Sequence, residues 1–419
     1  MISLIEVLNY RCLRYIRQPL GRFHVLVGPN ASGKTTFLDV VSFLSDLVAD
    51  GLDDAVGKRT QNLQDLTWLR RGTGFEIAVE APIPEDRRRL LAEENQRFDT
   101  IRYEVSIGSD PQTGETVICR EQGFLTSPAP PPPQRLLFPS PEVAPETITS
   151  PRRSAGSKAL FSKIPGGNDN FYAEAYAKEG RWAPAFKLGP RKSTLGNLPE
   201  DESKFPVSSW FKQLLGGGVE RITLNSQKMR RPSPPGQQIG FKPDGSNLPW
   251  VVERLRARNA NQFQEWLEHV RTALADIEDI RTVLRPEDNH RYLVLVYRGG
   301  LAVPSWTASD GTLRLLALTL PAYLEDFRGI YLIEEPENGI HPRAVETVCQ
   351  SLSSVYEGQI LVATHSPVIL SIVDPQDVLC FAKTPEGATD MVSGNRHPKL
   401  KDWRNEVNFG VLFAAGVLG

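Results

Sequence analysis

The sequence predicts an α/β fold in which a parallel core sheet carries a phosphate-binding loop and an antiparallel β subdomain is attached to it. Two observations lead to this prediction. Within residues 23–48 an apolar strand, a glycine-rich loop and an amphipathic helix follow one another, the order typical of a nucleotide site. Three later segments alternate apolar and polar residues, as strands with one buried face do: 75–81, 101–107 and 115–120. We expect an irregular insertion in the centre of the chain.

Composition narrows the class of protein. The 419 residues hold 48 Lys and Arg against 50 Asp and Glu, so no overall charge favours nucleic acid or an anionic membrane. The cysteines lack C-x-x-C spacing, which argues against a zinc site or a disulfide framework and fits a reducing compartment. No apolar stretch reaches the ~20 residues that span a bilayer, and the first residues lack a signal-peptide pattern. We expect a soluble, cytoplasmic protein.

The N-terminal part of the fold, residues 1–124, is predicted to be mainly strands. Apolar residues indicate a strand over 2–8, a return strand over 13–16 and a buried strand over 23–27. Helical spacing of apolar residues predicts a helix from Lys34 to about Val48, and leucines at 63, 66 and 69 suggest a short helix. The alternating segments 101–107 and 115–120 are expected to form a hairpin with a long loop.

The loop from Gly28 to Thr35 matches the phosphate-binding pattern G-x-x-x-x-G-K-[ST] at every fixed position. Its backbone N–H groups and the start of the following helix would surround one anion. Lys34 supplies a charge for the β- and γ-phosphates, and the Thr35 hydroxyl is placed for Mg²⁺. A chance match in a glycine-containing turn is the alternative, which the agreement of both flanks disfavours. The predicted nucleotide-binding residues are Asn30, Ala31, Ser32, Gly33, Lys34, Thr35 and Thr36.

The middle of the chain, residues 125–206, differs in composition. Residues 127–151 hold nine prolines and few β-branched residues, a composition that favours polyproline II or disorder. A solvated linker is the preferred interpretation, and a recognition peptide for an aromatic groove is the alternative. We expect a Pro/Gly-rich, partly disordered insertion, whose fold the sequence does not define.

Regular structure is predicted again in residues 207–419. Helices are expected over 210–215, 249–258 and 261–277, and strands over 219–224, 292–296 and 301–303. The helix over 261–277 carries an apolar stripe, which is typical of a core-facing helix and less so of a partner site. After residue 365 the sequence predicts a strand over 378–382 and an apolar run over 409–418.

Two carboxylates end the apolar strand that begins at residue 329. In a phosphate-loop enzyme the strand beside the nucleotide needs an acid at its carboxyl end to hold Mg²⁺ through water, and Glu334 fits this role. The adjacent Glu335 is placed to accept a proton from the water that attacks the γ-phosphate. Two solvated acids at a strand end are the alternative, which the presence of the phosphate loop disfavours.

Two further motifs occur in the order expected for such a site. Ser309, Asp310, Gly311 and Thr312 precede a leucine-rich helix, where a second anion would meet a helix N-terminus; an ordinary helix cap is the alternative. His365 follows the apolar strand 360–363. A lone histidine is usually structural, but this position suits a sensor of the γ-phosphate.

Together these motifs resemble the Walker A, signature, Walker B and switch-histidine motifs of the ABC-ATPase superfamily. The segments 335–342 (Glu-Pro-Glu-Asn-Gly-Ile-His-Pro) and 364–367 (Thr-His-Ser-Pro) are similar to the RecF/SMC/OLD-like branch, which includes ATPases of DNA repair and phage defence. Gly28 and Ser309 are 281 residues apart, whereas transporter subunits keep these motifs much closer. The resemblance covers about the first 80 and last 120 residues and leaves the middle unmatched.

The resemblance implies an ATP-binding head that pairs with a second copy, so that two nucleotides lie between the subunits. Glu334 would then hold Mg²⁺, Glu335 would be the catalytic base and His365 the switch. Ser309 and Gly311 would contact the γ-phosphate of the opposite subunit, and Arg11 would lie near the nucleotide. Departures from the transporter pattern occur at Ala308, Asp310, Thr312 and His341. The glutamine of the lid loop is not identified, with Gln61 and Gln64 as weak candidates.

The resemblance also implies a partner. No Toprim-like catalytic domain is apparent after His365, so we expect an effector, such as a nuclease, on a separate chain encoded nearby. The leading hypothesis is an ATP-hydrolysing switch that dimerises and regulates this effector in antiviral defence or DNA repair. The alternatives are an ATP-dependent scaffold for DNA or protein with negligible turnover, and a transporter-energising subunit. Basic patches would meet DNA or RNA, although solvated charge is their commoner meaning: 87–89, 152–153, 228–231 and 254–258.

Overall fold

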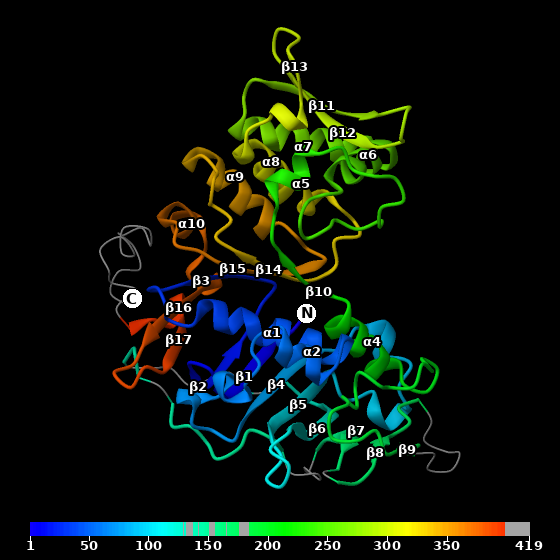
Figure 1. Ribbon diagram of the computed structural model, residues 1–419, viewed down its shortest axis with the longest axis vertical. Helices are drawn as coiled ribbons and strands as arrows, with labels where there is room; N and C mark the ends of the chain where they lie inside the picture. Colours follow the sequence, from blue (N-terminus) through cyan, green and yellow to red (C-terminus); the bar gives the residue numbers. More distant parts are fainter. Residues whose placement is uncertain are drawn as a thin grey trace.

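The computed structural model describes residues 1–128, 130, 137–140, 142–150, 156–164, 166–175 and 184–398. Figure 1 shows two lobes on either side of a central sheet, one built around a long antiparallel sheet and the other mainly of helices. The expected α/β fold, with a parallel core sheet and an antiparallel β subdomain, is confirmed. The expected division at residues 124 and 206 stays a prediction.

The central sheet has six strands, and five of them run parallel because helices or long crossovers connect them. At its carboxyl edge, Glu334 pairs with Ala363 and Ala363 pairs with Leu26. The segments that follow these residues therefore start side by side. In spatial order the strands are β10 (Val219–Ile222), β14 (Gly329–Glu334), β15 (Gly358–Ala363), β3 (Phe23–Val27), β16 (Val378–Lys383) and the antiparallel β17 (Thr389–Ser393).

The second sheet is antiparallel and has eight strands, and it includes the predicted hairpin as β5 and β6. In spatial order the strands are β2 (Leu13–Pro19), β1 (Leu4–Tyr10), β4 (Gly74–Pro82), β5 (Thr100–Ser109), β6 (Thr116–Thr126), β7 (Lys158–Lys163), β8 (Asp169–Phe171) and β9 (Ala185–Phe186). The last three lie in the region expected to be irregular. They are short, and Gly123 of β6 makes room for the Phe161 ring, because a Cβ there would lie 2.4 Å from it. Within the proline-rich segment 127–151, residues 129, 131–136, 141 and 151 lie outside the described residues.

Helices cover both faces of the parallel sheet (Figure 1). Helix α1 lies between this sheet and the antiparallel sheet, and the Phe43 ring packs against Tyr10 and Phe75 in the shared core. The helix that follows the glycine loop is therefore held on two sides. The helices are α1 (Lys34–Ala49), α2 (Leu52–Gly57), α3 (Glu85–Arg88), α4 (Pro206–Gly216), α5 (Ser226–Arg230), α6 (Leu248–Arg258), α7 (Ala260–Ala273), α8 (Asp310–Thr319), α9 (Pro342–Ser353) and α10 (Pro367–Ile372).

A second core fills the opposite face of the parallel sheet. Along β3, Val25 and Val27 join this core while Leu26 faces the first, as the two-residue period of a strand requires. The apolar stripe of α7 is buried here, as predicted. The helix nevertheless ends at Ala273, and Ile277 begins a strand. Ile277 is buried on the same side as the stripe, so its three-residue spacing from Leu274 fitted a helix equally well.

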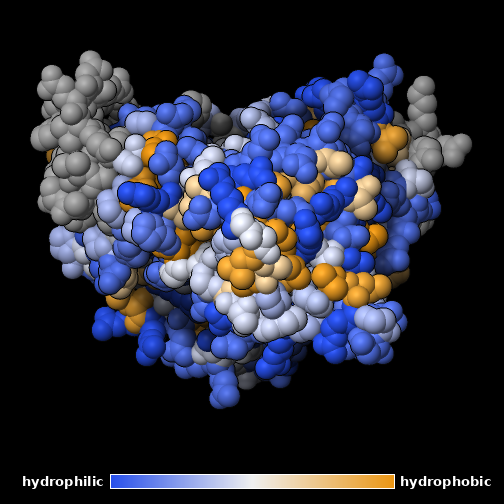
Figure 2. Space-filling view, turned by 90° about the horizontal axis from the view of Figure 1, so that it is seen from above, coloured by the Kyte–Doolittle hydropathy of each residue, from blue (hydrophilic) through white to orange (hydrophobic). Residues whose placement is uncertain are grey.

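A three-stranded antiparallel sheet completes the helical lobe: β11 (Ile277–Leu284), β12 (Arg291–Tyr297) and β13 (Ala302–Pro304). Figure 2 looks down on this lobe and shows a mainly hydrophilic face with separate apolar spots. Leu301, Val283 and Trp306 are among the exposed apolar residues of this region. Within the described ranges, none of the helices is both long and apolar enough to span a membrane.

Candidate nucleotide site

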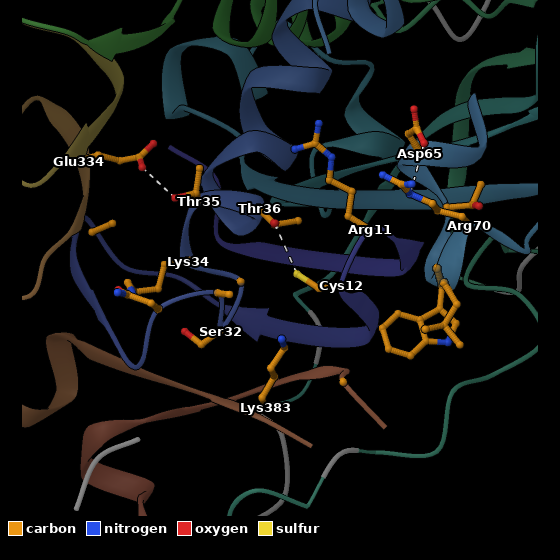
Figure 3. Close-up of a pocket in the computed structure, with 18 of the residues that line it drawn as sticks. Arg11, Cys12, Ser32, Lys34, Thr35, Thr36, Asp65, Arg70, Glu334 and Lys383 are labelled. Carbon is orange, nitrogen blue, oxygen red and sulfur yellow. Dashed lines mark hydrogen bonds and ion pairs between the residues drawn. The ribbon is translucent and has the colours of Figure 1, made fainter. Parts of the chain in front are cut away.

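A cavity of about 670 Å³ lies at the carboxyl edge of the parallel sheet. It is lined by residues 30–36 of the glycine loop and the start of α1, by Glu334 at the end of β14, and by Glu335 and His365 in the turns after β14 and β15. Figure 3 shows Lys34, Thr35 and Glu334 on one side of this cavity. The strand order therefore brings the glycine loop together with two motifs that lie some 300 residues later in the sequence.

The loop conformation depends on its two glycines. Gly33, at φ 106°, precedes α1, and a Cβ there would lie 2.3 Å from the Thr389 hydroxyl oxygen. At Gly28, with φ 150°, a Cβ would lie 2.3 Å from the Phe381 carbonyl oxygen. Thr389 also donates a hydrogen bond of 2.8 Å to the Ser32 carbonyl. Strands β16 and β17 thus hold the loop closely, a support that the sequence motif does not reveal.

Lys34 is the buried cation of the cavity. Its ammonium donates to the carbonyls of Gly28 at 2.8 Å and Pro29 at 3.0 Å, within the loop itself. Burial lowers the pKa of Lys34, and the nearby carboxylates of Glu335 and Glu334 oppose this shift. The hydrogen-bond partners of this ammonium are neutral carbonyl oxygens. A phosphate would form stronger hydrogen bonds with it, because a phosphate carries a full negative charge.

Thr35 and Glu334 meet as a pair of oxygen donors. The Thr35 hydroxyl donates to the Glu334 carboxylate at 2.8 Å, and Arg221 of β10 forms an ion pair with the other carboxylate oxygen. Hard oxygen ligands of this kind suit Mg²⁺. In the described ranges, no group of three or more His, Cys, Asp and Glu residues is arranged to hold a metal. A cation here would therefore need phosphate oxygens and water as further ligands, which fits a nucleotide–Mg²⁺ complex.

Glu335 lies at the turn that follows β14. Its backbone is left-handed, with φ 47°, and its N–H donates to the Ala363 carbonyl at 2.7 Å. The exposed carboxylate accepts a hydrogen bond from the Asn338 side chain. Such a φ is uncommon for a non-glycine residue, and the bond to β15 holds it. The arrangement keeps a carboxylate at the cavity beside Lys34.

Glu337 is a site residue that sequence reasoning missed. Its Oε1 accepts hydrogen bonds from the Thr364 hydroxyl at 2.7 Å and from the His365 backbone N–H at 2.9 Å. It thereby ties the turn after β14 to the turn after β15. The available signal was its position two residues after Glu335, but only the register of the strands shows which residues it reaches.

Arg11 lines the cavity, as the resemblance implied. It forms an ion pair of 3.1 Å with Asp39 of α1. Asp39 also accepts a 2.7 Å hydrogen bond from the Tyr10 hydroxyl and pairs with Arg59 at 2.8 Å. This network fixes the β1–β2 turn to the helix that carries the glycine loop.

Ser309 and Gly311 do not line this cavity. Ser309 is exposed and caps α8, accepting a hydrogen bond of 3.1 Å from the Thr312 N–H. The start of α8 packs tightly, since a Cβ on Gly311 would lie 2.6 Å from the Gly339 carbonyl oxygen. Arg230 steadies the same loop through Asp310 at 2.7 Å.

The far end of the cavity holds residues that sequence reasoning did not assign. Figure 3 shows Asp65 and Arg70 at that end, with Cys12 and Lys383 between them and the phosphate end. Trp68 and Leu69, which precede Arg70, also line the cavity. Gln61 and Gln64, the weak lid candidates, are exposed and do not line the cavity. The short-helix pattern at 63, 66 and 69 gave the right location, but Leu69 is 54% exposed while the other two leucines are buried.

The fold and this cavity define the nucleotide-binding head of a P-loop ATPase. Within that class the chain belongs to the AAA_21 family, described as "AAA domain, putative AbiEii toxin, Type IV TA system", which matches residues 23–371. No curated protein matches the chain.

Heads of SMC proteins are among the solved structures with a similar fold. The SmcHead bound to the C-winged helix domain of ScpA has a TM-score of 0.52 at 14% identity, covering 94% of this chain and 97% of the other. An Smc head domain from Pyrococcus furiosus, bound to the C-terminal domain of ScpA, has a TM-score of 0.48 at 13% identity, covering 96% and 99%. The SMC head domain from Thermotoga maritima has 0.43 at 10%, covering 94% and 98%. At these identities the likeness concerns the fold.

Proposed function

We propose that this protein is an ATP-hydrolysing switch that dimerises around ATP and regulates an effector, such as a nuclease acting on nucleic acid, in antiviral defence or DNA repair. The observation that carries the proposal is the division of the motifs. One cavity gathers Lys34, Thr35, Glu334, Glu335 and His365, while the exposed Ser309 lies outside it. A site divided in this way is completed by a second copy of the chain.

In this proposal each residue has a distinct role. Lys34 exchanges its carbonyl partners for the β- and γ-phosphates, and the loop N–H groups bind the same phosphates. Thr35 and Glu334 hold Mg²⁺, which when bound neutralises phosphate charge. Glu335 accepts the proton of the attacking water, and His365 contacts the γ-phosphate.

Replacing the base tests hydrolysis. Glu335→Gln preserves the shape of the side chain and removes its basicity, so we expect kcat to fall by about 100-fold or more with the Kd for ATP little changed. Glu357→Gln, an exposed carboxylate outside the cavity, is the matched control. Turnover that survives Glu335→Gln would refute the role of Glu335. A wild-type protein that binds ATP without turnover would favour the scaffold hypothesis instead.

Mixing two inactive variants tests the shared site. Lys34→Ala removes the phosphate cation, and Ser309→Arg blocks the start of α8. In a sandwich dimer, a mixed pair would contain one intact composite site, so an equal mixture should recover about a quarter of wild-type turnover. Lys34→Ala mixed with Glu335→Gln is the control: both defects lie in the same half-site, so neither composite site of a mixed dimer is intact. No recovery with Ser309→Arg would refute the sandwich.

The comparisons with known proteins bear on the effector and its setting. The description of the matching family names a putative toxin of a toxin–antitoxin system. The SmcHead, which has a similar fold, was solved in complex with a domain of another protein, ScpA. Both support a protein partner for this chain. Co-purification of the tagged Glu335→Gln variant from its native host, with and without ATP, tests this; an effector should be enriched only when ATP is present.

A further inference from the structure

The turn after β14 contains the single Asn-Gly dipeptide of the sequence, Asn338 and Gly339. Both residues are exposed, and they closely follow Glu335, which lines the nucleotide cavity. An asparagine loses its side-chain amide most readily when a glycine comes next, because a glycine has no side chain to obstruct the ring that forms and its backbone is free to turn. The surroundings of these two residues decide whether this reaction can occur here.

The backbone nitrogen of Gly339 is free to react. The N–H groups of its two neighbours in the chain donate to backbone carbonyls at 3.0 Å, which holds the turn on both sides. Among the described residues, none accepts a hydrogen bond from the Gly339 N–H between them. The Arg314 side chain of α8 lies alongside, since a Cβ on Gly339 would be 3.8 Å from the Arg314 Nε. A nearby cation favours the loss of a proton, which this nitrogen must lose before it attacks.

We propose that Asn338 is a site of spontaneous deamidation that ends the activity of the nucleotide site. The Gly339 nitrogen loses its proton to water and attacks Asn338 Cγ. The new C–N bond closes a succinimide ring, the Cγ–Nδ2 bond breaks, and ammonia leaves. Water then opens the ring: addition at Cγ restores the main chain with an aspartate at position 338, and addition at the main-chain carbonyl gives isoaspartate. The net reaction consumes one water and releases one ammonia.

The product changes a contact that orients Glu335. The Asn338 amide donates a hydrogen bond to the Glu335 carboxylate. A carboxylate in its place has no proton to donate near neutral pH, so two negative charges face and repel each other. Isoaspartate also adds a methylene to the main chain of the turn that Glu337 ties to His365. The effect on turnover rests on the proposed function, whereas the modification itself does not.

Ageing the purified protein at mildly alkaline pH and mapping its peptides by mass spectrometry tests the modification. We expect the peptide that contains residue 338 to gain mass before any other asparagine-containing peptide, because a hydroxyl replaces an amino group. Labelling with an isoaspartyl methyltransferase should detect the isoaspartate form. Asn225, which precedes a serine and caps α5, is the internal comparison and should react much more slowly. An unmodified residue 338, or one that reacts no faster than Asn225, would overturn the site.

Turnover measured on the same samples tests the consequence. Activity should fall in proportion to the modified fraction. Asn338→Gln, whose longer side chain closes a larger ring far more slowly, should keep its own starting activity throughout. Asn338→Asp, prepared directly, should lower kcat about ten-fold and leave the Kd for ATP within about twofold, because it removes a hydrogen bond to a charged group.

Modification of Asn338 without loss of turnover would refute its effect on the nucleotide site. Loss of turnover at the same rate in Asn338→Gln would refute it as well. A protein that never hydrolyses ATP would refute the proposed function, and the mass measurement would still decide whether Asn338 is a deamidation site.

Discussion

Removing the Glu337 carboxylate should loosen the turn that carries His365. Glu337 Oε1 is the acceptor for both the Thr364 hydroxyl and the His365 N–H, at 2.7 and 2.9 Å. Thr364 is fully buried, so its hydroxyl cannot turn to solvent. An unpaired donor in such a place costs about 1–3 kcal/mol, and Glu337→Ala therefore destabilises this turn by about that amount. Glu337→Gln keeps an acceptor without charge and should lose roughly half as much.

Hydrogen exchange measured by mass spectrometry tests this locally. A loss of 2 kcal/mol or more raises the exchange rate of the protected amides at residues 364–366 by about 30-fold or more. Turnover should fall as well, since His365 is displaced from the cavity. Glu346→Ala, an exposed carboxylate on α9, is the control and should leave both unchanged. Unaltered exchange at residues 364–366 in Glu337→Ala would refute the reasoning, as would an increase spread evenly over the chain.

Three further predictions follow from the contacts around the site. In Gly33→Ala the added Cβ would lie 2.3 Å from the Thr389 hydroxyl oxygen, at a backbone φ of 106°. We expect the free energy of unfolding to fall by about 1–3 kcal/mol, measured by thermal denaturation, and ATP binding to be abolished, measured by calorimetry. Full ATP affinity would contradict this prediction. Burial lowers the pKa of His24 to about 4, so the unfolded chain binds the proton more readily. Unfolding free energy should fall by about 3 kcal/mol as the pH drops from 6.5 to 4, and His24→Gln should remove this component. Arg221 forms an ion pair with Glu334 and would compete with a bound cation for this carboxylate. Arg221→Gln removes the competitor, so the Mn²⁺ concentration for half-maximal ATP binding should drop by up to about fivefold. An unchanged concentration would exclude this competition.

The sequence predicted those parts of the site whose chemistry is local. The loop from Gly28 to Thr35 is contiguous, so its motif can be recognised directly. Glu334 and His365 stand out because Glu334 ends an apolar strand and His365 closely follows one. Glu337 and Thr389 could not be assigned in this way. Glu337 binds residues 364 and 365, which the register of the sheet brings near, and Thr389 binds the Ser32 carbonyl from the β16–β17 hairpin. No local sequence pattern indicates these pairings.

The fold was predictable where strands and helices are long and periodic, as in α1 and the β5–β6 hairpin. It was not predictable where short elements depend on their neighbours. Strand β7 is stable because Phe161 packs over Gly123 and because Lys163 pairs with the buried Asp169 at 2.6 Å. Ile277 satisfies the apolar spacing of a helix although it begins β11, since burial on one side is compatible with either structure.

The packing of α8 limits how Ser309 can take part in catalysis. A Cβ on Gly311 would lie 2.6 Å from the Gly339 carbonyl oxygen, and α8 lies against α9, so a shift of the start of α8 would disturb the turn after Glu335. That turn is the one which Glu337 ties to His365. This close packing supports the proposal that Ser309 binds the nucleotide of a second copy and not that of its own chain. The mixed-variant experiment tests this directly.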